Sequence, residues 1–119
     1  MTITLEYKFK DELSDSEIEQ MSKLHLKNGL LWPHFKRKKE CEVVLAFLKH
    51  KIIAWGLVFY NKEVNSNECH IYVSPQYRRL GIGTQIFEIF SDLYVDGLLV
   101  SKWSKEAEKF YSNFDEVVD

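Results

Sequence analysis

The stretch from Glu68 to Tyr94 places the strongest constraint on how this chain can fold. It begins with alternating residues, which indicate a strand. One face of that strand carries Cys69, Ile71 and Val73, and the other carries Glu68, His70 and Tyr72. Because Pro75 cannot donate a hydrogen bond to a neighbouring strand, we expect the strand to end there. Apolar residues then recur at helical spacing, namely Ile82, Ile86, Phe87, Ile89, Phe90 and Leu93.

A loop with two arginines and two glycines joins the predicted strand to the predicted helix. The first N–H groups of a helix lack partners within it, and the helix dipole adds partial positive charge there. Gly81 and Gly83 leave room for a diphosphate to approach, and Arg78 and Arg79 add full charge. The whole arrangement therefore predicts an anion site, whereas the alternative is a turn that only opens a packed helix.

Two other phosphate-binding loops are excluded. The sequence contains no Gly-x-x-x-x-Gly-Lys-Ser/Thr segment. A dinucleotide fingerprint needs a third glycine at position 86, where Ile86 stands.

The segment from Val73 to Thr84 resembles the acetyl-CoA-binding motif of GNAT-type N-acetyltransferases, which reads Val-x-Pro, a short gap and then Arg/Gln-x-x-Gly-x-Gly/Ala. Arg78, Gly81 and Gly83 fill the last part of that motif. The later segment Ala107-x-x-Phe110-Tyr111-x-x-Phe114 is similar to one on the last helix of the family, although it is one residue shorter and lacks a glycine. The resemblance covers roughly residues 41 to 114. It implies an α/β, three-layer GNAT-like fold with a central mixed sheet flanked by helices, in a single domain of residues 1–119.

The same resemblance implies that acetyl-CoA is the co-substrate, that an amine is the acceptor and that no metal takes part. The backbone of Tyr72 and Val73 would hold the pantetheine arm of the coenzyme where two parallel strands splay apart. The diphosphate would be bound by the loop residues Arg78, Arg79, Leu80, Gly81, Ile82, Gly83 and Thr84. Trp32 and Phe35 would contact the acceptor, besides anchoring their segment to the core.

An acceptor amine must lose a proton before it attacks. Glu68 and His70 share a predicted strand face with Tyr72, so either can act as the base, directly or through water. Tyr111 matches the family tyrosine that protonates the leaving thiolate. The alternatives remain a structural role for His70 and Glu68 and helix packing for Tyr111.

The rest of the chain predicts the element order β-α-β-β-β-α-β-α. Residues 2–9 alternate as a strand, and Ser14 with Glu17 forms a capping box that begins a helix ending near Gly29. Residues 42–48 and 52–60 form an apolar hairpin, in which Gly56 marks a bulge or a close backbone approach. Residues 98–101 form a short strand parallel to the one at 68–73, and a last helix begins at Ser104. The basic run from His34 to Lys39 is interpreted as a solvated loop or helix face, with binding of an acidic partner as the alternative.

Composition and chain end limit the partners. With 119 residues, 45% of them hydrophobic, the chain can bury a core, and its net charge of −2 does not favour nucleic acid. The cysteines and histidines show no metal-ligand spacing, and the absence of an apolar leader predicts a cytoplasmic protein.

The family usually has two more strands after the last helix, where this chain has at most a stub at residues 116–118. This shortened C-terminus favours a protein lysine or N-terminus as acceptor over a small amine, and it predicts a possible homodimer through an exposed strand edge. A catalytically weak or inactive binding module for a protein partner is the alternative function.

Overall fold

The computed structural model describes residues 2–24, 31–100 and 117–118. They form one six-stranded sheet in the order β1-β2-β3-β4-β5-β6. The strands are β1 (Ile3–Phe9), β2 (Glu42–Leu48), β3 (Lys51–Asn61), β4 (Ser66–Val73), β5 (Leu98–Val100) and β6 (Val117–Val118). The first four pair antiparallel, and β4–β5 and β5–β6 pair parallel, as predicted for β4 and β5.

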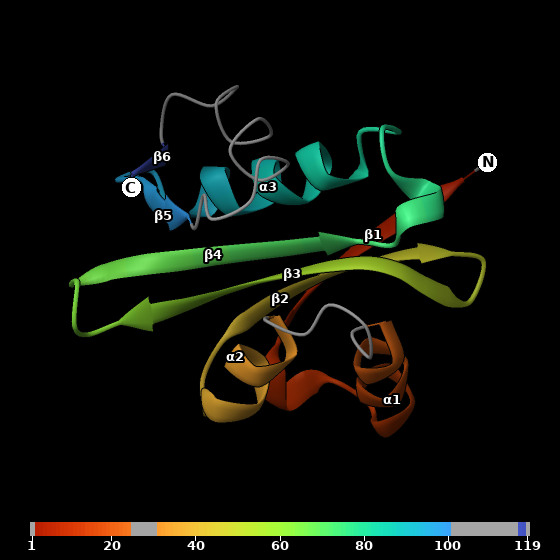
Figure 1. Cartoon of the computed structure of the whole chain (residues 1–119), viewed down its shortest axis with the longest axis horizontal. Coiled ribbons are helices and arrows are strands. Elements are labelled where there is room, and N and C mark those ends of the chain that lie inside the picture. Colours follow the sequence, from red (N-terminus) through yellow and green to blue (C-terminus); the bar gives the residue numbers. More distant parts are fainter. Residues whose placement is uncertain (1, 25–30, 101–116, 119) are drawn as a thin grey trace.

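The helices lie on opposite faces of this sheet, which gives three layers (Figure 1). One face is covered by α1 (Asp15–Leu24) and α2 (Leu31–Arg37), and the other by α3 (Ile82–Leu93). Two short 3₁₀ helices, η1 (Lys10–Glu12) and η2 (Pro75–Tyr77), follow β1 and β4. The mixed sheet between two helical layers confirms the predicted fold class.

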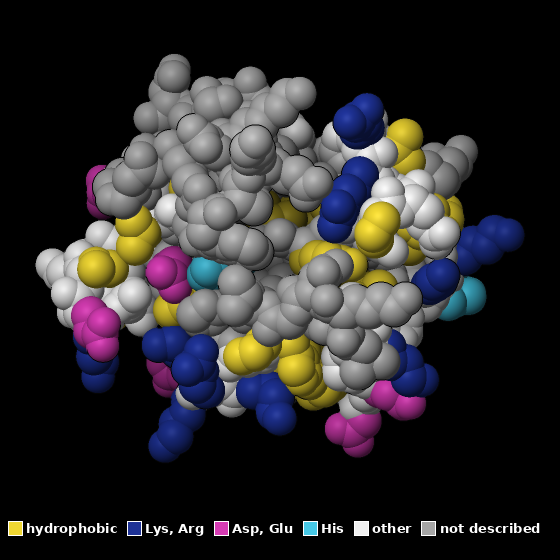
Figure 2. Space-filling view, in the orientation of Figure 1, with side chains coloured by type: hydrophobic (Ala, Val, Ile, Leu, Met, Phe, Trp, Pro, Cys, Tyr) yellow, Lys and Arg dark blue, Asp and Glu magenta, His cyan; other side chains and the backbone are white. Residues whose placement is uncertain are grey.

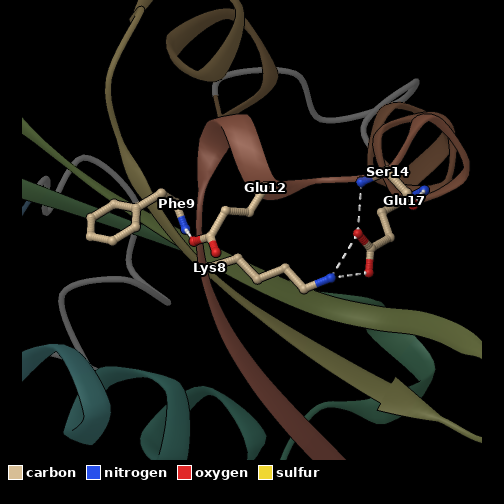
Figure 3. Close-up of polar contacts among 5 residues, drawn as sticks. All are labelled: Lys8, Phe9, Glu12, Ser14 and Glu17. Atoms are coloured by element: carbon tan, nitrogen blue, oxygen red, sulfur yellow. Dashed lines mark hydrogen bonds and ion pairs between the residues drawn. The ribbon is translucent and has the colours of Figure 1, made fainter.

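The start of α1 is stabilised by the predicted capping box, and a basic side chain from β1 reinforces it (Figure 3). The Ser14 hydroxyl accepts a hydrogen bond from the Glu17 N–H at 3.1 Å, and the Glu17 carboxylate accepts one from the Ser14 N–H at 2.9 Å. The Lys8 ammonium donates to both oxygens of that carboxylate, at 3.0 and 2.8 Å. These contacts fix α1 to β1, so that Met21 on its inner face is fully buried.

The central hairpin divides the core into two clusters, one on each face of the sheet. Under α1 and α2 lie Met21, Phe35, Cys41, Val43, Leu45, Ile52, Trp55, Leu57 and Phe59. Under α3 the buried side chains of the sheet meet Ile82, Ile86, Phe87 and Phe90. This double coverage confirms that β2 and β3 are buried on both faces. Leu93, which was expected on the same helix face, is 52% exposed because α3 ends there, beyond the core.

Gly56 lies at a close approach between β3 and α3. A Cβ added there would lie 2.8 Å from Cγ2 of Ile86 and 3.1 Å from Cγ1 of Ile71. The irregularity in the hairpin occurs instead between Ala46 and Phe47 of β2. Of the two alternatives for Gly56, the structure therefore supports close packing.

The helix α2 was not predicted as such, because Pro33 within Leu31–Arg37 indicated a turn. Proline is tolerated in the first turn of a helix, where its missing N–H would have no partner in any case. The end of α2 is held by Lys10, whose ammonium donates to the carbonyl oxygens of Phe35 and Lys38 at 2.5 and 2.7 Å. The predicted end of the first helix near Gly29 and the predicted last helix from Ser104 lie outside the described residues.

Candidate active site

The loop between β4 and α3 is built from backbone hydrogen bonds and two left-handed residues. The Ser74 N–H donates to the Ile53 carbonyl at 2.9 Å, and the Tyr77 N–H donates to the Ser74 carbonyl at 2.9 Å. The strand therefore ends before Pro75, as predicted. Arg79 and Gly81 then adopt positive φ angles of 65° and 79°. Such alternating conformations turn successive backbone N–H groups toward one side, which is a geometry that binds anions.

Gly81 is the N-cap of α3 and adopts the left-handed conformation. A Cβ added to Gly81 would meet no atom within 4 Å, so a glycine is favoured here by its φ angle rather than by crowding. The same openness leaves the amides that begin α3 approachable. Arg79 and Leu80 beside them are exposed, while Ile82 is 2% exposed and fixes the helix to the core. Gly83 and Thr84 are half-buried in the first turn. These features suit the diphosphate of a coenzyme.

Arg78 points back toward the end of β4. Its Nε donates to the Val73 carbonyl at 2.9 Å, and its guanidinium carbon lies 5.7 Å from the centre of the Tyr72 ring. Arg78 therefore stabilises the loop conformation. Arg79 is also exposed, and it lies nearer in sequence to the start of α3.

The parallel pairing of β4 with β5 is short in the part of the chain that the structure describes. It consists of Glu68 opposite Leu99 and Cys69 opposite Val100, whereas β4 continues to Val73. The backbone from His70 to Val73 is thus paired with β3 on one side and has no described β5 partner on the other. The position of the pantetheine arm beside the half-buried Tyr72 and Val73 therefore stays a prediction, because residues 101–116 lie outside the described part of the chain.

Glu68 and His70 lie in contact on β4. The His70 Nε2 lies 3.1 Å from a Glu68 carboxylate oxygen, and the two side chains are 14% and 16% exposed. The His70 ring stacks on Phe59 at a centroid distance of 5.9 Å and an interplanar angle of 10°. Both side chains lie on the face of β4 opposite α3, as the alternation predicted. The pair can accept and pass on a proton.

A pocket of about 310 Å³ opens beside Glu68. Its lining residues are Arg37, Lys38, Phe59, Asn61, Glu63 and Glu68. The Lys38 ammonium lies 4.6 Å above the centre of the Phe59 ring, so the end of α2 is fixed against β3. Figure 2 shows dark-blue lysine and arginine side chains gathered on this face of the molecule, close to acidic and histidine side chains.

The basic run is visible in the sequence, but no sequence pattern predicted Phe59, Asn61 and Glu63 as pocket residues. The hairpin register supplies a signal for one of them, because Phe59 lies directly opposite Glu68 and so shares its face. The proximity of Arg37 and Lys38 to this hairpin depends on α2, which the sequence pattern did not predict.

Trp32 and Phe35 anchor α2 to the core, as expected. Their rings stack at 5.2 Å, and the Phe35 ring meets Trp55 edge-on at 5.7 Å. Phe35 is 3% exposed, whereas Trp32 is half-buried and lines a second pocket of about 430 Å³ with Pro33, Lys36 and Arg37. Their contact with an acceptor remains a prediction, for which Trp32 is the more accessible of the two. Tyr111, the expected proton donor, lies outside the described residues.

Other chemistry finds little support within the described ranges. Burial raises the pKa of the Cys41 thiol to about 11 and raises the pKa of Cys69 still further, so neither offers a thiolate nucleophile at neutral pH. No group of three or more potential metal-ligating side chains lies together among the residues described. None of the described helices is long and apolar enough to cross a membrane.

The fold and this site can now be compared with known proteins. A family model described as an acetyltransferase (GNAT) domain matches residues 39–115, and a search of curated protein sequences found no match. A ribosomal-protein-alanine N-acetyltransferase from Brucella melitensis biovar Abortus 2308 is similar with a TM-score of 0.68 and 12% identity, over 100% of this chain and 94% of that one.

Two further solved structures share this fold. An aminoglycoside acetyltransferase from an uncultured soil metagenomic sample, in complex with trehalose, has a TM-score of 0.66 and 18% identity over 95% of this chain and 87% of that one. A GNAT family acetyltransferase from Streptococcus pneumoniae TIGR4 has a TM-score of 0.67 and 17% identity over 94% of this chain and 85% of that one. Because the family match spans more than half of its length, the chain belongs to the GNAT acetyltransferase family, a family of acyltransferases.

Proposed function

We propose that this chain transfers an acetyl group from acetyl-CoA to an amine. The observation that carries the proposal is the turn at residues 79–81, where two positive φ angles and an uncapped helix start leave backbone amides open beside an exposed arginine. A diphosphate fits such a place because it accepts several hydrogen bonds at once and gains from the helix dipole.

The loop residues would bind the coenzyme, and β4 would orient it. The amides of Gly81, Ile82, Gly83 and Thr84 would face the diphosphate, and the exposed Arg79 would add a positive charge. Arg78 keeps the loop in shape through Val73 and Tyr72. The backbone of Tyr72 and Val73 on β4 would hold the pantetheine arm as an added strand.

Residues of this chain carry out the proton transfers. When bound, acetyl-CoA supplies an acetyl thioester, so that a new bond forms between the amine nitrogen and the acetyl carbon, the carbon–sulfur bond breaks and coenzyme A leaves as a thiol. The Glu68–His70 pair takes the proton that the attacking amine loses, directly or through water. Tyr111 is proposed to return a proton to the leaving sulfur. Holding both substrates in line supplies much of the remaining acceleration.

Two kinds of acceptor are compatible with this chemistry. A protein lysine or N-terminus is one candidate, for which intact-mass analysis of proteins is the direct assay. The pocket beside Glu68 favours a small amine, since its volume of about 310 Å³ falls in the range of roughly 300–1,000 Å³ that is common for small-molecule sites.

Calorimetric titration of the whole chain with acetyl-CoA tests the proposal. We expect saturable binding that Arg79→Gln weakens about tenfold, as one charge-assisted hydrogen bond would. Lys39→Gln, an exposed change in the basic run, is the matched control. Absence of saturable binding would overturn the proposal. Saturable binding with no acetylated product by intact-mass analysis, over proteins and small amines alike, would instead support an inactive binding module.

A further inference from the structure

The pocket beside Glu68 has basic side chains on one wall and acidic side chains on the other. Arg37 and Lys38 come from the end of α2, and Glu63 and Glu68 come from the β3–β4 hairpin. Within residues 2–24, 31–100 and 117–118, no ion pair joins Arg37 or Lys38 to Glu63 or Glu68. Opposite charges that share one pocket without neutralising each other suit a ligand that carries both signs.

Hydrogen bonds connect the basic wall to η1. Lys10 in η1 donates to the carbonyl oxygens of Phe35 and Lys38, at and just beyond the end of α2. Lys38 lies over the Phe59 ring, and the Arg37 Nε donates to the Pro33 carbonyl at 3.3 Å. This last bond uses only one N–H of the guanidinium, whose remaining donors have the fork geometry that matches a carboxylate.

The acidic wall leads to the proposed proton acceptor. Asn61 accepts a hydrogen bond from the Glu63 N–H at 3.0 Å, which fixes the turn that carries Glu63. Glu68 is less exposed than Glu63 and lies in contact with His70. A cationic amine is therefore attracted toward the place where it must lose its proton.

We propose that the acceptor is a small amine that also carries a carboxylate, an amino-acid-like compound whose carboxylate binds Arg37 and Lys38 while its amine faces Glu68. This inference rests on the proposed function and specifies its acceptor. Arg37 and Lys38 are then specificity-determining residues, and Lys10 is a positioning residue for Lys38. The pocket volume of about 310 Å³ is sufficient for a compound of this size.

The test uses matched acceptors that differ only in the negative charge. Release of coenzyme A is measured with the whole chain at saturating acetyl-CoA, for each standard amino acid and for its carboxamide. A carboxamide has the less basic amine, so more of it is deprotonated at neutral pH. A preference for the carboxylate therefore cannot come from amine basicity. We expect at least one amino acid to be used with a higher kcat/KM than its carboxamide.

Variants then locate the preference. Arg37→Gln and Lys38→Gln should each lower the ratio of kcat/KM for the amino acid over its carboxamide about tenfold. Arg37→Lys should retain part of the preference, and Lys39→Gln should leave it unchanged. Calorimetric binding of the preferred amino acid in the presence of coenzyme A should weaken in the same order, and thermal unfolding verifies that each variant is folded.

Two outcomes separate this inference from the function on which it rests. The inference is overturned if acetyl-CoA binds but only neutral, cationic or protein amines are acetylated. It is also overturned if the preference for the amino acid over its carboxamide survives in the Arg37→Gln/Lys38→Gln double variant. In both cases the acetyltransferase function stands. If acetyl-CoA does not bind, the proposed function itself fails.

Discussion

The Nε2 of His70 lies 3.1 Å from a carboxylate oxygen of Glu68, and the two residues share one face of β4. Both side chains are more than four-fifths buried, at 14% and 16% exposed. A hydrogen-bonded carboxylate can fix the orientation and tautomer of an imidazole. Within the proposed proton-accepting pair, we therefore expect His70 to take the proton and Glu68 to orient the imidazole ring.

His70→Gln is expected to lower kcat by about 10²–10⁴-fold, the usual range for loss of a general base. The affinity for acetyl-CoA should stay unchanged, because the diphosphate loop begins beyond Ser74. Glu68→Gln should lower kcat less, by about tenfold, since the amide keeps the shape and some hydrogen bonding. Steady-state kinetics with calorimetry separates these effects. The reverse order of losses would assign the base to Glu68, and full activity in both variants would remove the pair from the chemistry.

Gly81→Ala is expected to destabilise the chain by about 1–2 kcal/mol, because an alanine is strained at a φ of 79°. No clash contributes, since the added Cβ meets nothing within 4 Å. Gly81→Asn should cost less, because asparagine tolerates the left-handed region. Urea unfolding measures both variants, and the affinity for acetyl-CoA should fall in the same order. Equal losses for alanine and asparagine would contradict the conformational explanation.

Gly56→Ala should destabilise for a different reason, by about 1–3 kcal/mol, because its Cβ would lie 2.8 Å from Cγ2 of Ile86 in a packed core. A double-mutant cycle with Ile86→Ala measures this contact. The double variant should lose less stability than the sum of the single variants, since the alanine at position 86 removes the clashing methyl group. Simple additivity would show that the approach of α3 to β3 does not constrain Gly56.

Local patterns predicted most of the elements that position the site. Alternation placed Glu68 and His70 on one face, and the proline and glycines placed the loop before α3. The same alternation grouped Ile3, Leu5, Tyr7 and Phe9, but Phe9 is 52% exposed. How far along the sheet a covering helix extends depends on tertiary packing, which alternation does not encode.

The pocket beside Glu68 could not be predicted for a related reason. Arg37 and Glu68 are far apart in the sequence, and their proximity depends on α2 and on the bonds from Lys10 that hold its end. A lysine in a 3₁₀ helix after an edge strand gives no sequence signal for that role. The charge run at residues 34–39 was visible in the sequence, but its orientation toward the β3–β4 hairpin became clear only from the fold.

The contact between Lys8 and Glu17 predicts how stability depends on pH. Burial raises the pKa of the Glu17 carboxyl, but the hydrogen bonds from Lys8 and Ser14 outweigh burial and lower that pKa below its ordinary value of 4.5. A carboxyl whose pKa is lower in the folded state binds a proton more readily when unfolded. Its stabilising contribution is therefore complete above about pH 4.5 and is lost as the pH falls through the lowered folded-state pKa.

Glu17→Gln should therefore lower the free energy of unfolding at pH 7 by about 1 kcal/mol, because it removes a half-buried ion pair and weakens the cap of α1. Denaturant unfolding between pH 7 and pH 3 should show a smaller loss of stability on acidification in this variant than in the parent chain. Glu19→Gln is the control, since its ion pair with Lys23 is about two-thirds exposed, at 67% and 68%, and should contribute less than about 0.5 kcal/mol. Glu19→Gln could change the pH dependence of stability as strongly as Glu17→Gln does. That result would show that general surface charge, and not the contact between α1 and β1, controls stability in acid.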